Sequence, residues 1–178
     1  MVIGPLCVIP GTSPVRDDNG AMDTLELGSR TFAISRAQKQ DVPKIVALLA
    51  DDVLGRDREG QNLEPYEQAF ARISRDENQL LLAVRDEEEA LIATMQLTLM
   101  PSLSRGGATR LQIEAVRVAA STRGSGLGAA LFEWAHRWGR GHGAQLAQLT
   151  TDASRTDAQR FYTKLGYAPS HVGFKLPL

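Results

Sequence analysis

The sequence predicts a single domain of the mixed α/β class, with helices and strands layered around a partly antiparallel sheet. The chain has 178 residues, which is the size of one domain. Hydrophobic residues make up 43% and charged residues 23%, as in a folded protein rather than a disordered one. After residue 30, segments with the two-residue period of strands are interspersed with segments that have the 3.6-residue period of helices.

The first 30 residues differ from the rest. Residues 1–14 hold three of the eight prolines, and residues 16–20 are polar and turn-forming. We therefore expect residues 1–30 to form a loose arm before one domain at 31–178, with Met22 as an alternative start. No basic residues precede the short apolar stretch, so we expect no secretory signal and a cytoplasmic location.

The first half of the domain is expected to contain three strands and two helices. Alternation predicts a strand at 31–35. Asp41 and Pro43 are a capping acid and an early proline, which predict a helix reaching about residue 50. The further elements expected here are a helix at 64–74 and strands at 79–85 and 91–100, joined by the acidic turn 86–89.

The second half is expected to alternate strands and helices. Two glycines at 106–107 precede a strand at 111–118. The helix at 126–140 has the clearest pattern, because its apolar residues recur at helical spacing. The remaining expected elements are a strand at 144–150, a short helix at 156–165 and a last strand at 171–176.

The charge and cysteine content exclude several classes of protein. Twenty Lys and Arg against 21 Asp and Glu give a net charge of −1, which argues against a nucleic-acid partner. A single cysteine, Cys7, excludes an intrachain disulfide, and we expect it to be inert. The three histidines, His136, His142 and His171, lack ligand spacing, so no metal site is expected.

Glycines concentrate where the 111–118 strand leads into the long helix. Gly124, Gly126 and Gly128 would let an anion approach the free amides of the first helical turn, and Arg123 adds a positive charge. The alternative is that the glycines serve only tight packing. A P-loop is disfavoured because Ala129 and Ala130 follow Gly128, and the glycine spacing does not fit a dinucleotide fingerprint.

Two motifs in this chain resemble those of the GNAT N-acetyltransferase superfamily. Arg123, Gly126 and Gly128 match its Gln/Arg-x-x-Gly-x-Gly/Ala motif for acetyl-CoA. Residues 158–167 match its Ala-x-x-Phe-Tyr-x-x-x-Gly-Phe/Tyr helix. The likeness covers residues 31–178 and is closest to a bacterial subgroup that ends in Ser-His-x-Gly-x-Lys, here at 170–175. It implies a mixed, mostly antiparallel sheet of about six to seven strands, with helices on both faces.

The resemblance also implies where acetyl-CoA binds. The pyrophosphate would lie on the backbone amides of Arg123, Gly124, Ser125, Gly126, Leu127, Gly128 and Ala129. The pantetheine arm would pair with backbone groups of Val116, Arg117 and Val118, in a slot opened where residues 149–151 diverge. An amide near Val118 would polarise the thioester carbonyl. Many relatives have an asparagine where Arg155 stands, so Arg155 is expected to reach a phosphate instead.

The resemblance assigns catalytic roles to two residues. Tyr162 is the candidate general acid, because a phenol, with a pKa of about 10 against about 8.5 for a thiol, holds a proton at neutral pH and can supply a proton or a hydrogen bond to the leaving sulfur. Its alternative role is an aromatic that covers the core. Glu114 is the candidate general base, or else an ion-pair partner of Arg110 or Arg117. Strand alternation would place Glu114, Val116 and Val118 on one face.

The sequence does not identify the acceptor. We expect its site to involve Asp51, Asp52 and Tyr66 with the loop 101–107, although Asp51 and Asp52 also suit a solvated helix end. The predicted function is direct transfer of acetyl from acetyl-CoA to a primary amine, more readily of a small molecule than of a protein. The alternative is a non-catalytic acyl-CoA sensor or interaction module. A homodimer is compatible with the family.

Overall fold

The computed structural model describes residues 21–51, 56 and 58–178. Its strands are β1 (Ala21–Leu27), β2 (Arg30–Arg36), β3 (Gln79–Arg85), β4 (Leu91–Met100), β5 (Thr109–Val118) and β6 (Ala144–Gln148). Its helices are α1 (Val42–Ala50), α2 (Glu64–Ile73), α3 (Ser104–Gly107), α4 (Leu127–Gly141) and α5 (Thr156–Lys164), with 3₁₀ turns η1 (Lys39–Asp41) and η2 (Ala120–Thr122).

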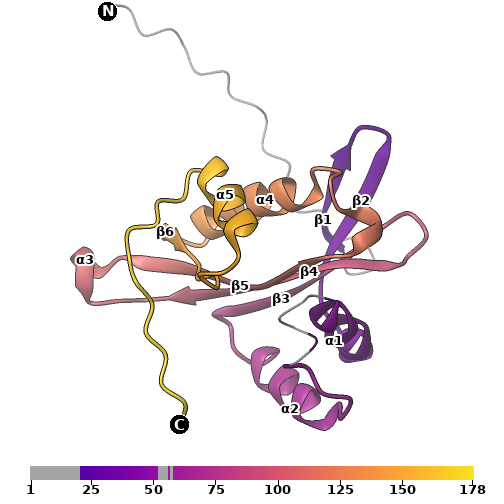
Figure 1. Cartoon of the computed structure of the whole chain (residues 1–178), viewed down its shortest axis with the longest axis horizontal. Helices are drawn as coiled ribbons and strands as arrows, with labels where there is room; N and C mark the ends of the chain where they lie inside the picture. Colours follow the sequence, from indigo (N-terminus) through magenta and orange to yellow (C-terminus); the bar gives the residue numbers. More distant parts are fainter. Residues whose placement is uncertain (1–20, 52–55, 57) are drawn as a thin grey trace, which may run out of the picture.

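The six strands form one sheet in the order β1-β2-β3-β4-β5-β6. All neighbours are antiparallel except β5 and β6, which are parallel. Helices α1 and α2 cover one face, and α4 and α5 cover the other (Figure 1). The predicted fold class is confirmed, including the mostly antiparallel sheet between two helical layers.

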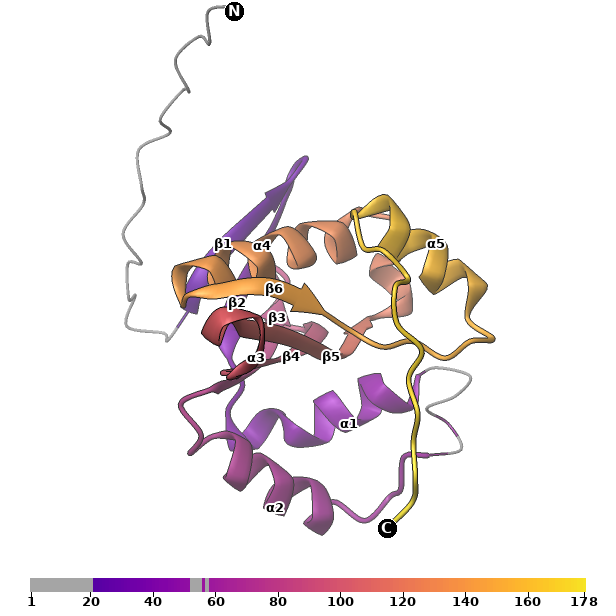
Figure 2. The ribbon, with the colours of Figure 1, turned by 90° about the vertical axis from the view of Figure 1, so that its left-hand side faces the viewer.

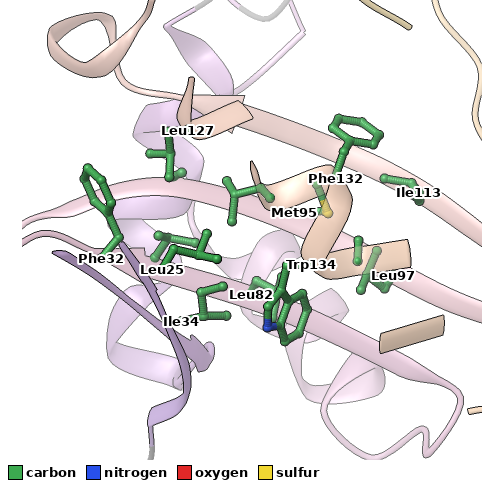
Figure 3. Packing of buried hydrophobic residues seen from close by; sticks show 14 of the residues in the cluster. Leu25, Phe32, Ile34, Leu82, Met95, Leu97, Ile113, Leu127, Phe132 and Trp134 are labelled. Carbon is green, nitrogen blue, oxygen red and sulfur yellow. The ribbon is translucent and has the colours of Figure 1, made fainter. Parts of the chain in front are cut away.

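The larger core lies between α4 and the sheet. Phe132 of α4 is buried in one cluster with Met95 and Leu97 of β4 (Figure 3). Leu131 of α4 is buried in the same cluster. The smaller core lies on the other face, where Ile45 of α1 is buried with strand residues of β3. The helical period of the sequence therefore marks the faces that become buried.

Two expectations about the ends of the chain are wrong. Residues 21–27 are not part of a loose arm, because they form β1 and pair with β2 along its length. Trp134 on α4 helps to hold this strand, since its Nε1 donates to Asp23 Oδ2 at 2.7 Å. The expected strand at 171–176 is absent: residues 171–178 have no regular secondary structure and are exposed. Residues 1–20 of the expected arm, Cys7 among them, lie outside the described residues.

The described part of the chain contains no helix long and apolar enough to span a bilayer.

Candidate functional site

The site begins where β5 and β6 separate. Their pairing runs from Thr109 and Ala144 to Gln112 and Gln148. Beyond this point β5 continues to Val118, whereas β6 ends. Within the described residues, the second half of β5 is therefore paired only with β4, as predicted for the divergence near residues 149–151. Its other backbone edge can accept an extended ligand as a strand accepts a neighbour.

The loop after β5 presents free backbone amides. Gly124 and Gly126 have φ angles of +82° and +87°, which favour glycine. The N–H groups of Gly124, Gly126, Gly128 and Ala129 make no hydrogen bond within the described part of the chain. A Cβ at Gly124 or Gly126 would meet nothing within 4 Å. Open space beside unpaired amides at the start of a 15-residue helix suits a phosphate group.

Close packing holds α4 against β5. A Cβ at Gly139 would lie 2.7 Å from Cδ2 of Leu111, so any other residue would require this side chain to shift. The buried side chains of Leu127 and Leu131 fix the start of the same helix. The position of the amide loop relative to β5 is thus set by the core.

Arg123 connects the loop to helix α1. Its Nη2 donates to Asp51 O at 3.1 Å and to Asp51 Oδ2 at 3.3 Å. Its Nε donates to the carbonyl of Val118 at 3.3 Å. Asp51, which was expected to contribute to the acceptor site, is therefore paired with an arginine. Asp52 lies outside the described residues.

A β-bulge in β5 changes which of its side chains share a face, compared with the expectation from regular alternation. Ala115 has a φ of +51°, and the β4–β5 register shifts between Thr94 and Gln96. One extra residue reverses the alternation, so Val116 and Val118 pack on the α4 side with Ile113. Glu114 instead pairs with Gln96, which lines a cavity under α1 and α2. Glu114 is thus on the opposite face from Val116 and Val118, and simple alternation gave the wrong result.

Glu114 is exposed on this face. It forms no ion pair with Arg110 or Arg117, which removes the structural alternative raised for it. Arg117 pairs with Thr94 in the sheet, and its Nη1 donates to the carbonyl of Val116 at 2.8 Å.

The two sequence motifs meet at the start of α4. A Cβ at Gly128 would lie 3.6 Å from the ring of Phe161. Tyr162 follows on α5 and packs edge-on against Phe132, with 5.6 Å between ring centroids. Tyr162 is partly buried, and this burial raises the pKa of its phenol, while the positive charges of Arg155 and Arg117 oppose the rise. The phenol therefore stays protonated at neutral pH and can donate a proton or a hydrogen bond.

A partly buried polar pair next to Tyr162 was not found from the sequence. Tyr167 Oη and His136 Nε2 lie 2.7 Å apart, and the Tyr167 and Tyr162 ring centroids are 6.1 Å apart. Burial raises the pKa of Tyr167 to about 12, and burial lowers the pKa of His136. The available signal was the four-residue spacing of Phe132 and His136, which places both on one face of α4.

The cavity under α1 and α2 has a volume of about 140 Å³. Its walls are mainly aliphatic, with Tyr66, Gln96 and Ala115 among them. Tyr66 Oη donates to Glu59 Oε2 at 2.7 Å, and this hydrogen bond raises the pKa of Tyr66. The loop 101–107 does not join this region: it leads into the start of β5, at the opposite end of the strand from Val118 (Figures 1 and 2). The expectation that it contributes to the acceptor side is not supported, because a ten-residue strand spans about 33 Å.

No group of three or more His, Cys, Asp or Glu side chains suited to a metal occurs in the part of the chain that the structure describes.

The bulged, half-paired strand and the free amides at the next helix define the class of acetyl-CoA-dependent acyltransferases that the motifs indicated. Residues 45–167 match the model of the acetyltransferase (GNAT) family. Since this match covers more than half of the chain, the protein belongs to that family.

Individual proteins resemble this chain in sequence or in fold. The crystal structure of a transcriptional regulator from Bacillus halodurans C-125 has 39% identity and a TM-score of 0.78, and covers 83% of this chain and 99% of its own. Glucosamine-6-phosphate N-acetyltransferase from Arabidopsis thaliana has 20% identity and a TM-score of 0.68, and the match covers 82% of this chain and 97% of that one. At this identity the likeness shows the fold alone. The aminoalkylphosphonate N-acetyltransferase of Salmonella typhimurium (strain LT2) is 40% identical over 63 residues, which are 35% of this chain and 41% of that protein. The match therefore spans less than half of this curated relative.

Proposed function

We propose that this protein transfers the acetyl group of acetyl-CoA directly to the primary amine of a small molecule. The observation that carries the proposal is the continuity between the half-paired end of β5 and the amide loop at Gly124–Ala129. A CoA molecule needs both features, because its pantetheine arm is an extended amide chain and its pyrophosphate is an anion.

Binding and orientation come from backbone groups. The amides of Gly124, Gly126, Gly128 and Ala129 would hold the pyrophosphate, and Arg155 is the candidate to add positive charge. The carbonyls of Val116 and Val118 already accept bonds from arginines, yet each retains a second lone pair for a pantetheine amide. When bound, acetyl-CoA supplies the activated thioester carbonyl, which a Val118 amide would polarise.

Two side chains would handle the protons. The Tyr162 phenol is protonated at neutral pH, so it can supply a hydrogen bond or a proton to the departing sulfur, and the rise of its pKa on burial favours the hydrogen bond over full transfer. Glu114 is the candidate base, which would remove a proton from the incoming ammonium directly or through water. Glu114 pairs with Gln96 on the face of the sheet that carries α1, α2 and their cavity, on which we place the acceptor.

The test is release of CoA thiol with a panel of primary amines, in which aminoalkylphosphonates come first because of the relative from Salmonella typhimurium. Tyr162→Phe should lower kcat by about 10²-fold or more while leaving the Kd for CoA within twofold. Tyr167→Phe is the matched control, since it removes the neighbouring hydroxyl that is bonded to His136. Equal kcat values for the two variants would refute the acid role of Tyr162.

Glu114→Gln provides a second test, because it keeps the shape of the side chain and removes its charge. We expect kcat/KM to fall by about 10²-fold. An unchanged kcat/KM would assign the base elsewhere.

A second function is favoured by one relative. The Bacillus halodurans protein with 39% identity is a transcriptional regulator, which suits an acyl-CoA sensor. A sensor would bind CoA at the same loop and release no thiol with any amine of the panel.

A further inference from the structure

The cavity under α1 and α2 is lined mainly by apolar side chains. Ile45 and Leu49 come from α1, Phe70 comes from α2, and Leu81 comes from β3. The two helices lie next to each other over this face of the sheet (Figures 1 and 2). Water needs two to four polar partners to occupy a cavity, so a space with this lining is filled more favourably by an apolar group.

The two polar side chains at the cavity already have partners. Tyr66 Oη donates to Glu59 Oε2 at 2.7 Å and accepts the N–H of Gly60 at 2.8 Å, so its ring is the part left to meet a ligand. Gln96 Nε2 donates to Gln79 Oε1 at 2.9 Å, which leaves its amide oxygen. Within the described residues no lysine or arginine lines the cavity. An anionic group there would be buried without a counter-charge, which is costly.

The volume of the cavity suits a six-membered ring. It measures about 140 Å³. An apolar cavity of about 150 Å³ in another protein stays dry and binds benzene. Ala69 of α2 lines the cavity and is exposed, so the space borders the protein surface and a ligand can enter it.

The cavity adjoins the part of β5 that we assign to the pantetheine arm. Ala115 lines the cavity, and residues 116–118 extend at most about 10 Å beyond it. Gln96 also lines the cavity and pairs across the sheet with Glu114, the candidate base. An amine on a short linker can therefore reach the thioester while an apolar group at the other end of the linker stays between the helices.

We propose that the acceptor is a primary amine whose short linker carries an apolar group about the size of a six-membered ring, and that this group binds between α1 and α2. The inference rests on the proposed function, because it concerns the acceptor of that reaction. It ranks such amines above aminoalkylphosphonates, since the cavity has no cation to offer a phosphonate.

The test compares 2-phenylethylamine with ethylamine and 2-aminoethylphosphonate in the thiol-release assay. Complete burial of a phenyl group corresponds to about 10- to 100-fold in an equilibrium constant, so kcat/KM for 2-phenylethylamine should exceed that for ethylamine by this factor. Ala69→Leu places a larger side chain at the cavity and should reduce the ratio at least tenfold. Ala71→Leu is the matched control, because it makes the same change in α2 at a position that does not line the cavity, and it should keep the ratio.

The outcomes separate this inference from the proposed function. A ratio near one, a ratio unchanged in Ala69→Leu, or a higher kcat/KM for 2-aminoethylphosphonate would overturn the inference and leave acetyl transfer intact. If no amine releases thiol, the proposed function fails, and calorimetric titration of 2-phenylethylamine into the CoA-bound protein becomes the test of the cavity. Binding that is lost in Ala69→Leu and kept in Ala71→Leu would support the ligand class, whereas no binding would overturn it. Binding of CoA to each variant confirms that it is folded.

Discussion

Substitution of Gly126 by aspartate tests the anion site most directly. Gly126 has a φ of +87° and open space around its missing Cβ. The new carboxylate would therefore enter the space that we assign to the pyrophosphate. Two unit charges about 4 Å apart repel by about 1 kcal/mol in water and about 4 kcal/mol at the effective dielectric constant of a protein surface. The Kd for CoA should consequently rise between about fivefold and a thousandfold.

Two controls separate charge from backbone strain. Gly126→Asn has nearly the same shape without the charge, and it should raise the Kd much less than the aspartate. Gly143→Asp places an aspartate at a similar φ of +80° with open surroundings, at the other end of α4. Each substitution at positive φ should cost about 1–2 kcal/mol of stability. Calorimetric titration with CoA is the assay, and equal Kd values for Gly126→Asp and Gly143→Asp would refute the anion site.

Three further predictions concern the surroundings of the site. Asp51→Asn should lower the Kd for CoA about two- to fivefold, because it removes the carboxylate that competes with CoA for Arg123. The effect is small because this ion pair is exposed and is worth less than about 1 kcal/mol. A higher Kd in calorimetric titration would contradict this. Burial lowers the pKa of His136 in the folded protein, so this imidazole binds a proton more tightly in the unfolded chain. The free energy of unfolding should therefore fall as the pH drops below 6.5, the pKa of the unfolded state. The Tm of His136→Gln should therefore fall less than that of the wild type between pH 7.5 and pH 5, and parallel curves would exclude this linkage. Ala115→Gly should raise stability by about 1 kcal/mol in urea unfolding, since it relieves a φ of +51°, and a loss of stability would show that the bulge is not strained.

The sequence predicted the regular elements well because the periods of burial are strong there. The strands at 79–85 and 91–100 begin and end as predicted, and the helices deviate by about one residue. The amide loop at Gly124–Gly128 could be located because glycine spacing reflects backbone conformation directly.

The remaining features depend on contacts between distant segments. Strand β1 contains Asp23 and Glu26, which weaken its apolar alternation, and it forms because β2 offers a partner. The bulge at Ala115 leaves no signal, since alanine has no preference for positive φ. Residues 171–176 have the pattern of a strand but no partner within one chain of this structure. The pairing of Tyr167 with His136 needs α4 and α5 packed together, which no local pattern specifies.

The bulge at Ala115 determines which side chains of β5 face the core under α4 and which face α1 and α2. Upstream of it, odd-numbered positions such as Leu111 and Ile113 belong to the large core, and downstream the even-numbered Val116 and Val118 take over that role. Glu114 and Arg117 are therefore both turned to the side of α1 and α2, although three positions separate them. Regular alternation through Ala115, without the bulge, would still let the strand hydrogen-bond to β4, yet it would turn the Arg117 side chain toward the core and Val116 and Val118 toward α1 and α2. The backbone conformation at this one residue thus determines which side chains of β5 line each face of the sheet.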